Sequence, residues 1–269
     1  MDKKYELTDI TKTVFLGDVE RRTVVLHRIR ALIDFGDVKK GDLGGWVENE
    51  NVLSHEDECW IGDNAEVYRD GIVCDNAQVY NNAKVIAGRV CGNAEVSGHA
   101  KISGATISGN SEVFAYATVA NYVTVCGNAQ ICGHAFLYGY VEVLDEAEVY
   151  GCTTIYDNAK IYGNAEIYGY ASVENNAKIG GSSHVNGSSK IGQNANINTT
   201  TDYLVIGPVG SRQDHTTFYK GGDEIYVRTG CFRGTLKEFK NAVKKKHKFN
   251  SVHRKDYMKI IRFAKKKLK

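Results

Sequence analysis

The chain has 269 residues, with 28 Gly, a single Pro and a formal net charge of +2. No apolar run is long enough to span a membrane and the N-terminus lacks a signal-peptide core, so the composition excludes an integral membrane protein. Seven Cys, an odd number without Cys-x-x-Cys spacing, favour free thiols and a cytoplasmic location.

Residues 1–60 precede a regular repeat, and we expect them to form a β cap. Thr23–Phe35 alternates in the manner of one or two strands, and Gly41–Val47 is typical of a turn that enters the next segment. A cap is needed because an uncovered first coil would expose an open strand edge.

Residues 61–198 repeat one six-residue phrase, clearest in Asp157–Tyr162 and Gly163–Tyr168. A small residue, mostly Ala, stands two positions before each aliphatic residue, and a Gly-Asn or Asp-Asn pair follows it. Residues two apart share one face of a strand, and Gly and Asn tolerate a left-handed corner. The phrase therefore predicts a short strand and a corner. The aliphatic residues stand at 23 positions: 67, 73, 79, 85, 90, 96, 102, 107, 113, 119, 125, 131, 137, 143, 149, 155, 161, 167, 173, 179, 185, 191 and 197.

This pattern resembles the hexapeptide-repeat, left-handed parallel β-helix family. The segments Gly41–Glu56 and Ile206–Phe239 resemble those of uncharacterised members from bacteria and their phages. The resemblance covers about half of the chain and implies a mainly β fold of about eight triangular coils, three phrases to a coil. Two steps of the repeat have five residues, Val85 to Val90 and Ile102 to Ile107. They lie three phrases apart, so on a three-sided coil they shorten the same side in successive coils.

After Thr199 the repeat stops, and residues 199–269 are expected to form a separate module. Tyr203–Gly207, His215–Tyr219 and Glu224–Arg228 are predicted strands. Thr235 and Glu238 have the spacing of a capping box that opens a helix to about His247, and a second helix is predicted from about Ser251 to Lys267.

The C-terminal segment is strongly basic. Residues 237–269 hold 14 Lys or Arg and two acidic residues, a balance of +12, whereas residues 1–236 hold 20 basic and 30 acidic residues, a balance of −10. Contact with nucleic acid phosphates, docking onto the acidic part of the protein itself, and a solvated helix face that suits the helix dipole are all consistent with this run.

Two corner columns differ in composition. One is nearly all Asn, which we interpret as a requirement of backbone geometry. The next replaces Asn by bulky or reactive side chains, although Tyr is costly where φ is positive. This column is either a packing edge or a ligand site, and its residues are His99, Tyr116, His134, Cys152 and Tyr170.

A third outward column holds three thiols, Cys74, Cys91 and Cys126. Three thiols on one ladder suit a soft metal ion. Because no His lies on that face and Cys is common on half-buried strands, we expect no metal and no cofactor.

These features favour a non-enzymatic binding scaffold, expected to be a homo-oligomer, most simply a trimer. Its expected partner is a host protein or a nucleotide-like ligand that stacks on Tyr side chains. The candidate polar contacts of such a ligand are Ser211, Arg212, Arg228 and Arg233.

Two other classes remain open. The resemblance also implies acyltransferases that use acetyl-CoA and a catalytic His, for which His99, His134 and His184 are candidates. Such enzymes insert a long loop into one coil, and this repeat has none. A structural solenoid that polymerises end to end is the third class. A resemblance to zinc carbonic anhydrases of this fold would imply a three-His site spread over two coils. That resemblance fails, because His99 and His134 lie two coils apart and Gly139 stands where the resemblance requires a His.

Overall fold

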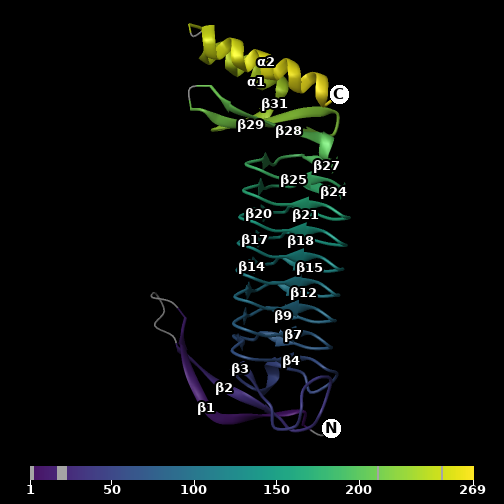
Figure 1. The fold of residues 1–269 in the computed structure, drawn as a ribbon. Coiled ribbons are helices and arrows are strands. Elements are labelled where there is room, and N and C mark those ends of the chain that lie inside the picture. The colour runs from purple at the N-terminus through teal and green to yellow at the C-terminus, as the bar shows by residue number, and fades with distance from the viewer. Residues whose placement is uncertain (1–2, 17–22, 211, 250) are drawn as a thin grey trace. The chain divides into compact units, whose positions relative to one another are not determined.

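The computed structural model describes residues 3–16, 23–210, 212–249 and 251–269. The chain divides into two compact units, Met1–Asp145 and Glu146–Lys269. Both units contain short parallel strands wound into coils, drawn in blue to teal and in teal to green in Figure 1. The predicted parallel β-solenoid is confirmed.

The coils of the first unit build three parallel ladders. One ladder contains β5 (Glu66–Tyr68), β8 (Lys84–Ile86), β11 (Lys101–Ser103), β14 (Thr118–Asn121) and β17 (Phe136–Gly139). A second contains β4 (Trp60–Ile61), β7 (Gln78–Val79), β10 (Glu95–Val96), β13 (Glu112–Val113) and β16 (Gln130–Ile131). The third contains β6 (Ile72–Val73), β9 (Arg89–Val90), β12 (Thr106–Ile107), β15 (Thr124–Val125) and β18 (Glu142–Val143). Successive strands enter different ladders, so three strands make one coil.

The second unit has three ladders of the same kind. They are β20 (Thr154–Asp157), β23 (Ser172–Val173) and β26 (Lys190–Ile191); β19 (Glu148–Val149), β22 (Glu166–Ile167) and β25 (His184–Val185); and β21 (Lys160–Ile161), β24 (Lys178–Ser182) and β27 (Asn196–Thr199). Within the described residues, β4–β18 thus make five coils in the first unit, and β19–β27 make three coils in the second. The eight complete coils agree with the predicted number.

The aliphatic positions of the repeat form the core inside the coils. The side chains at all 23 positions are fully buried. Burying one Val or Ile side chain stabilises a fold by about 1.5–3 kcal/mol. Backbone N–H groups of each coil donate to carbonyl groups of the next, as from Glu95 to Ser111 at 2.9 Å and from Glu166 to Ser183 at 2.8 Å.

Both five-residue steps shorten the same side of successive coils, as predicted. The first connects β8 to β9 and the second connects β11 to β12, which occupy matching places in the ladders. Glu95 is therefore paired with Gln78, 17 residues earlier, whereas Thr124 is paired with Thr106, 18 residues earlier.

The Asn column has a different cause from the one predicted. The left-handed residue of each corner stands one position earlier, at Asp75, Gly92, Gly109 and Gly127. The Asn side chains instead form an amide ladder, in which Nδ2 of Asn76, Asn93 and Asn110 donates to Oδ1 of Asn93, Asn110 and Asn128 at 3.0, 2.9 and 2.9 Å. Side-chain hydrogen bonding between coils, and not φ, explains this column.

The N-terminal segment of the first unit is an antiparallel extension of one ladder. β1 (Tyr5–Phe15) pairs antiparallel with β2 (Thr23–Ala31), and β2 pairs antiparallel with β3 (Leu43–Val47). β3 then pairs in parallel with β5. The predicted turn over Gly41–Val47 is wrong for its larger part, because Leu43–Val47 is a strand that contributes the first parallel rung.

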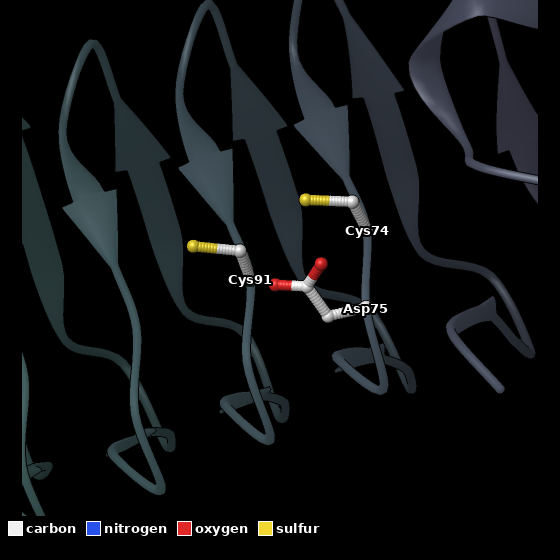
Figure 2. Close-up of side chains that lie close together, drawn as sticks. All are labelled: Cys74, Asp75 and Cys91. Carbon is white, nitrogen blue, oxygen red and sulfur yellow. The ribbon is translucent and has the colours of Figure 1, made fainter. Parts of the chain in front are cut away.

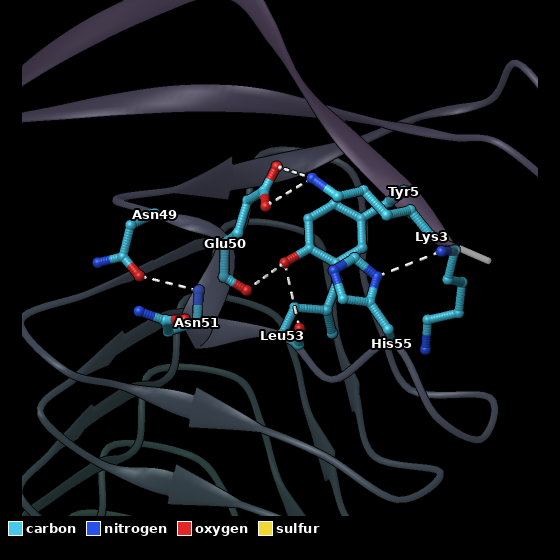
Figure 3. A network of polar contacts seen from close by, with 8 residues as sticks. Lys3, Tyr5, Asn49, Glu50, Asn51, Leu53 and His55 are labelled. Atoms are coloured by element: carbon cyan, nitrogen blue, oxygen red, sulfur yellow. Dashed lines mark hydrogen bonds and ion pairs between the residues drawn. The ribbon is translucent and has the colours of Figure 1, made fainter. Parts of the chain in front are cut away.

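A polar network around Tyr5 holds β1 against the segment that follows β3 (Figure 3). The buried Tyr5 hydroxyl donates to the backbone carbonyls of Glu50, at 2.7 Å, and Leu53, at 3.1 Å. Glu50 begins the short 3-10 helix η1 (Glu50–Val52), and its carboxylate pairs with Lys3 at 2.8 Å. The Tyr5 ring also stacks on His55, with 4.5 Å between ring centroids.

The second unit ends in an antiparallel sheet and two helices. The sheet has the order β28 (Tyr203–Val209), β29 (Asp214–Gly221), β30 (Glu224–Thr229) and β31 (Phe232–Thr235). The helices are α1 (Leu236–Lys246), whose Thr235–Glu238 capping box is confirmed, and α2 (Ser251–Lys267). The core between sheet and helices contains Phe218, Val227, Phe239, Val243, Ile261, Ala264 and Leu268. Among the described residues, neither helix is long and apolar enough to cross a membrane.

The corner at Ala115 offers a test of the backbone argument. Ala115 has φ +59°, and a left-handed non-Gly residue costs roughly 1–2 kcal/mol. We expect Ala115→Gly to raise the free energy of unfolding by about 1 kcal/mol in urea titrations. Ala117→Gly, at a buried position two residues on, is the control and should lower it by about 1 kcal/mol. A loss of stability from both substitutions would contradict the argument.

Candidate functional site

Three of the predicted corner residues form one aromatic stack in the first unit. The rings of His99 and Tyr116 lie 5.0 Å apart between centroids with an interplanar angle of 3°, and those of Tyr116 and His134 lie 5.1 Å apart with an angle of 7°. Tyr116 remains 57% exposed. The spacing between coils sets the spacing between the rings.

The stacked residues themselves do not occupy the left-handed backbone positions. The left-handed residue at these corners is the preceding one, Gly98, Ala115 or Gly133. The expectation that Tyr116 occupies a costly φ is therefore wrong, and no ligand is needed to explain the side chain.

The stack also presents ring edges to solvent more than ring faces. A flat ring inserted between two others needs about 3.5 Å on each side, or roughly 7 Å in total. The rings here are 5.0 and 5.1 Å apart, so both faces of Tyr116 are covered by its neighbours. A nucleobase therefore cannot insert between these three rings in the described geometry. An open hollow of about 630 Å³ adjoins its His99 end, beside Arg28 and Asn82.

The remaining corner residues of the column, Cys152 and Tyr170, lie in the second unit. The Cys152 backbone N–H donates to the Gly169 carbonyl at 2.7 Å, so the two occupy matching corners of successive coils. Both side chains are exposed, Tyr170 by 73%.

Two predicted arginines bind a carboxylate of the protein itself. The Glu174 side chain is only 2% exposed and contacts the Arg228 guanidinium, and Arg233 lies 3.2 Å from the same carboxylate oxygen. The Tyr156 hydroxyl also donates to Glu174. These contacts join the C-terminal sheet to the β23 coil, so the charges of Arg228 and Arg233 serve the fold.

Arg212 instead lies at a hollow of about 280 Å³ in the C-terminal module. Its walls come from β29, the β30–β31 turn, α1 and α2. The charged, thiol and aromatic residues that line this hollow include Arg212, Asp214, Cys231, Phe232, Lys246, His247 and Tyr257. Ser211, the other predicted contact in this region, lies outside the described residues.

The hollow combines cations with aromatic rings. His247 stacks on Tyr257, with centroids 5.5 Å apart at 29°, and Tyr257 meets Phe239 edge to face at 5.6 Å. Burial, helped by His253 and Lys246, lowers the pKa of His247, so this ring is neutral at pH 7. Arg212 and Lys246 therefore supply the positive charge of the hollow.

Asp214 is the acidic residue at this hollow, and its charge is largely compensated. Burial raises its pKa, but the His215 N–H, at 2.7 Å, and Lys190, at 3.6 Å, outweigh burial and leave the pKa below the usual value. The carboxylate is thus ionised and already partnered, and the hollow keeps a net positive character.

A His–Glu pair lies on the solenoid of the second unit. His184 Nδ1 is 3.2 Å from Glu166 Oε2, and the Tyr150 hydroxyl donates to the same oxygen at 3.2 Å. Burial, followed by the hydrogen bond to Glu166, raises the pKa of Tyr150 to about 12. His184 was a predicted candidate but Glu166 was not, although the 18-residue coil makes Glu166 the ladder neighbour of His184.

Cys74, Asp75 and Cys91 form a cluster of soft and hard donor groups in the first unit (Figure 2). Their nearest ligand atoms all lie within 4.8 Å of one another. Asp75 was not among the predicted partners of the thiols, because only a His on the same face was expected to complete a metal site. The sequence pattern that could have predicted this cluster is the adjacent pair Cys74 and Asp75, with Cys91 one 17-residue coil after Cys74. Cys126, two coils further along the column, is not part of the cluster.

Comparison with known proteins gives limited information. No protein-family model matches the chain. One relative, the uncharacterized acetyltransferase YdcK of Escherichia coli (strain K12), is 34% identical over 79 residues. The matched segment covers 29% of this chain and 24% of YdcK. The chain is thus a β-solenoid with partial similarity to a protein described as an acetyltransferase.

The Glu174 contacts yield a stability prediction. We expect Glu174→Gln to lower the free energy of unfolding by about 3 kcal/mol, because the buried Arg228 guanidinium loses its counter-charge. Thermal and urea unfolding measure this. Glu148→Gln, an exposed carboxylate on the same unit, should change stability by less than about 0.5 kcal/mol. Equal effects of the two substitutions would contradict a structural role for Glu174.

Proposed function

We propose that this protein is a ligand-binding β-solenoid whose C-terminal module holds a small anion that carries a flat ring, as a nucleotide does. The observation that supports this proposal is the convergence of Arg212 and Lys246 with the His247–Tyr257 stack at one hollow. Guanidinium and ammonium groups suit phosphate, and aromatic side chains suit a base.

The solenoid has the role of a rigid support in this proposal. Between β4 and β27, where the structure describes every residue, no long loop is inserted between the strands, so the coils carry no loop that could cover a substrate. Enclosed sites with a few convergent polar groups are the usual places for small ligands. The expected homo-oligomer would then display several copies of the module, and light scattering measures their number.

Calorimetry with mononucleotides and cyclic dinucleotides tests the proposal. We expect Arg212→Ala and Lys246→Ala each to weaken binding by about tenfold or more, since a hydrogen bond to a charged group contributes roughly 1.5–3 kcal/mol. Lys244→Ala, on the same helix but outside the hollow, is the matched control and should bind as the unmodified protein does.

Free nucleosides and inorganic phosphate complete this experiment. Weaker binding of each than of the nucleotide would support a site that uses both the ring and the charge. If no nucleotide gives heat, or if all three variants bind alike, the proposal is wrong.

A second candidate is acyl transfer from acetyl-CoA, which the partial similarity to YdcK and the His184–Glu166 pair favour. A carboxylate at Nδ1 orients an imidazole so that Nε2 can accept a proton from an attacking group. The pair lies on an open face of the coils, so a second subunit would have to complete any substrate pocket.

Acetyl-CoA binding by the intact oligomer tests this candidate. Acyl transfer predicts measurable heat with acetyl-CoA, and a turnover that falls by about 100-fold or more in His184→Ala because the general base is lost. His215→Ala, in the C-terminal sheet, serves as the His control. The absence of acetyl-CoA binding, or equal turnover in both variants, would exclude this use of His184.

A further inference from the structure

We propose that Cys74, Asp75 and Cys91 form a binding site for one thiophilic divalent cation such as Zn²⁺ or Cd²⁺ (Figure 2). This site is separate from the hollow of the C-terminal module and requires no residue of the second unit.

Parallel pairing of two coils brings the thiols together. Cys74 follows β6 and Cys91 follows β9, and Val73 is paired with Val90 in the ladder. The two Cys therefore leave the ladder at equivalent positions one rung apart, and Figure 2 shows their side chains projecting in the same direction. Both residues are half-buried.

Asp75 is held in place by the corner of the coil. Its backbone is left-handed, with φ +58°, and its Oδ2 accepts a hydrogen bond from the Gly92 N–H at 2.7 Å. The carboxylate is thus fixed beside both thiols before any cation arrives. Two sulfur donors and one oxygen donor, completed by a water molecule, are a donor set that Zn²⁺ accepts.

The distances require only a small adjustment. With Zn–S bonds of about 2.3 Å, the two sulfur atoms of a tetrahedral site lie about 3.8 Å apart. The three donor atoms lie within 4.8 Å of one another. Side-chain rotations that move the sulfur atoms by about 1 Å or less close the site, and the ladder itself need not change.

Arg89 compensates the charge of the occupied site. Two thiolates, one carboxylate and a divalent cation carry a net charge of −1. The Arg89 guanidinium donates from Nη2 to Cys74 Sγ at 3.4 Å, and it brings the total to zero. Cation binding converts two neutral thiols to thiolates, so two protons leave for each cation bound: M²⁺ + 2 RSH gives M(SR)₂ + 2 H⁺.

Cobalt(II) titration of the reduced full-length protein tests the proposal. We expect a thiolate-to-cobalt charge-transfer band that saturates at one cobalt per chain, disappears when Zn²⁺ is added, and accompanies proton release in weak buffer. Cys74→Ser and Cys91→Ser should each abolish the band, and Asp75→Asn should weaken binding. Arg89→Gln should weaken it by about tenfold, the effect typical of a group that supports a metal ligand.

Cys126→Ser is the matched control, because Cys126 lies on the same outward column but outside the cluster. It should leave the titration unchanged. Circular dichroism of each variant shows that the coils remain folded. The proposal is overturned if the unmodified protein gives no charge-transfer band, or if folded Cys74→Ser and Cys91→Ser titrate as Cys126→Ser does.

Discussion

The stacking of one coil on the next through backbone hydrogen bonds is the interaction on which the rest of this structure depends. Each strand has only two to five residues within the coils, far too short for independent stability. It persists because its N–H groups find carbonyls in the next coil and its aliphatic side chain joins a fully buried stack. The left-handed corners permit this repetition, because they turn the chain from one ladder into the next every five or six residues.

The same stacking explains most outward columns without a ligand. Identical positions in successive coils lie about 4.8 Å apart, so like side chains meet. Asn meets Asn in an amide ladder, and His99, Tyr116 and His134 meet as a ring stack. A solenoid therefore satisfies its own surface groups along each column, and regular columns are weak indicators of binding. Irregular sets, such as two thiols beside a carboxylate, or a His beside a Glu, carry more chemical information.

The C-terminal module differs because one of its hollows is lined by residues from both its sheet and its helices. Antiparallel strands and two packed helices bring residues from distant parts of the sequence to one hollow, where Arg212, Lys246 and Tyr257 converge. Two other arginines of the same region, Arg228 and Arg233, are held by the buried Glu174. Three arginines that the sequence did not distinguish thus have different roles. Arg228 and Arg233 form ion pairs within the protein, whereas Arg212 lines the hollow.

The sequence by itself determined the parallel solenoid, its fully buried positions, the side shortened by the two five-residue steps, and both helices. These are local or periodic properties, and the six-residue period places every inner side chain. The tertiary structure alone decided the remaining features. These are the strands β1 and β31, the hydrogen bonds that explain the Asn column, and the partners of His184, Cys74 and Arg228. The partners of these residues come from other coils or from another sheet. The six-residue phrase that contains a residue does not specify which side chain or counter-charge lies beside it. For that reason the periodicity determines the solenoid, whereas the contacts between successive coils and with the C-terminal module determine where candidate binding sites form.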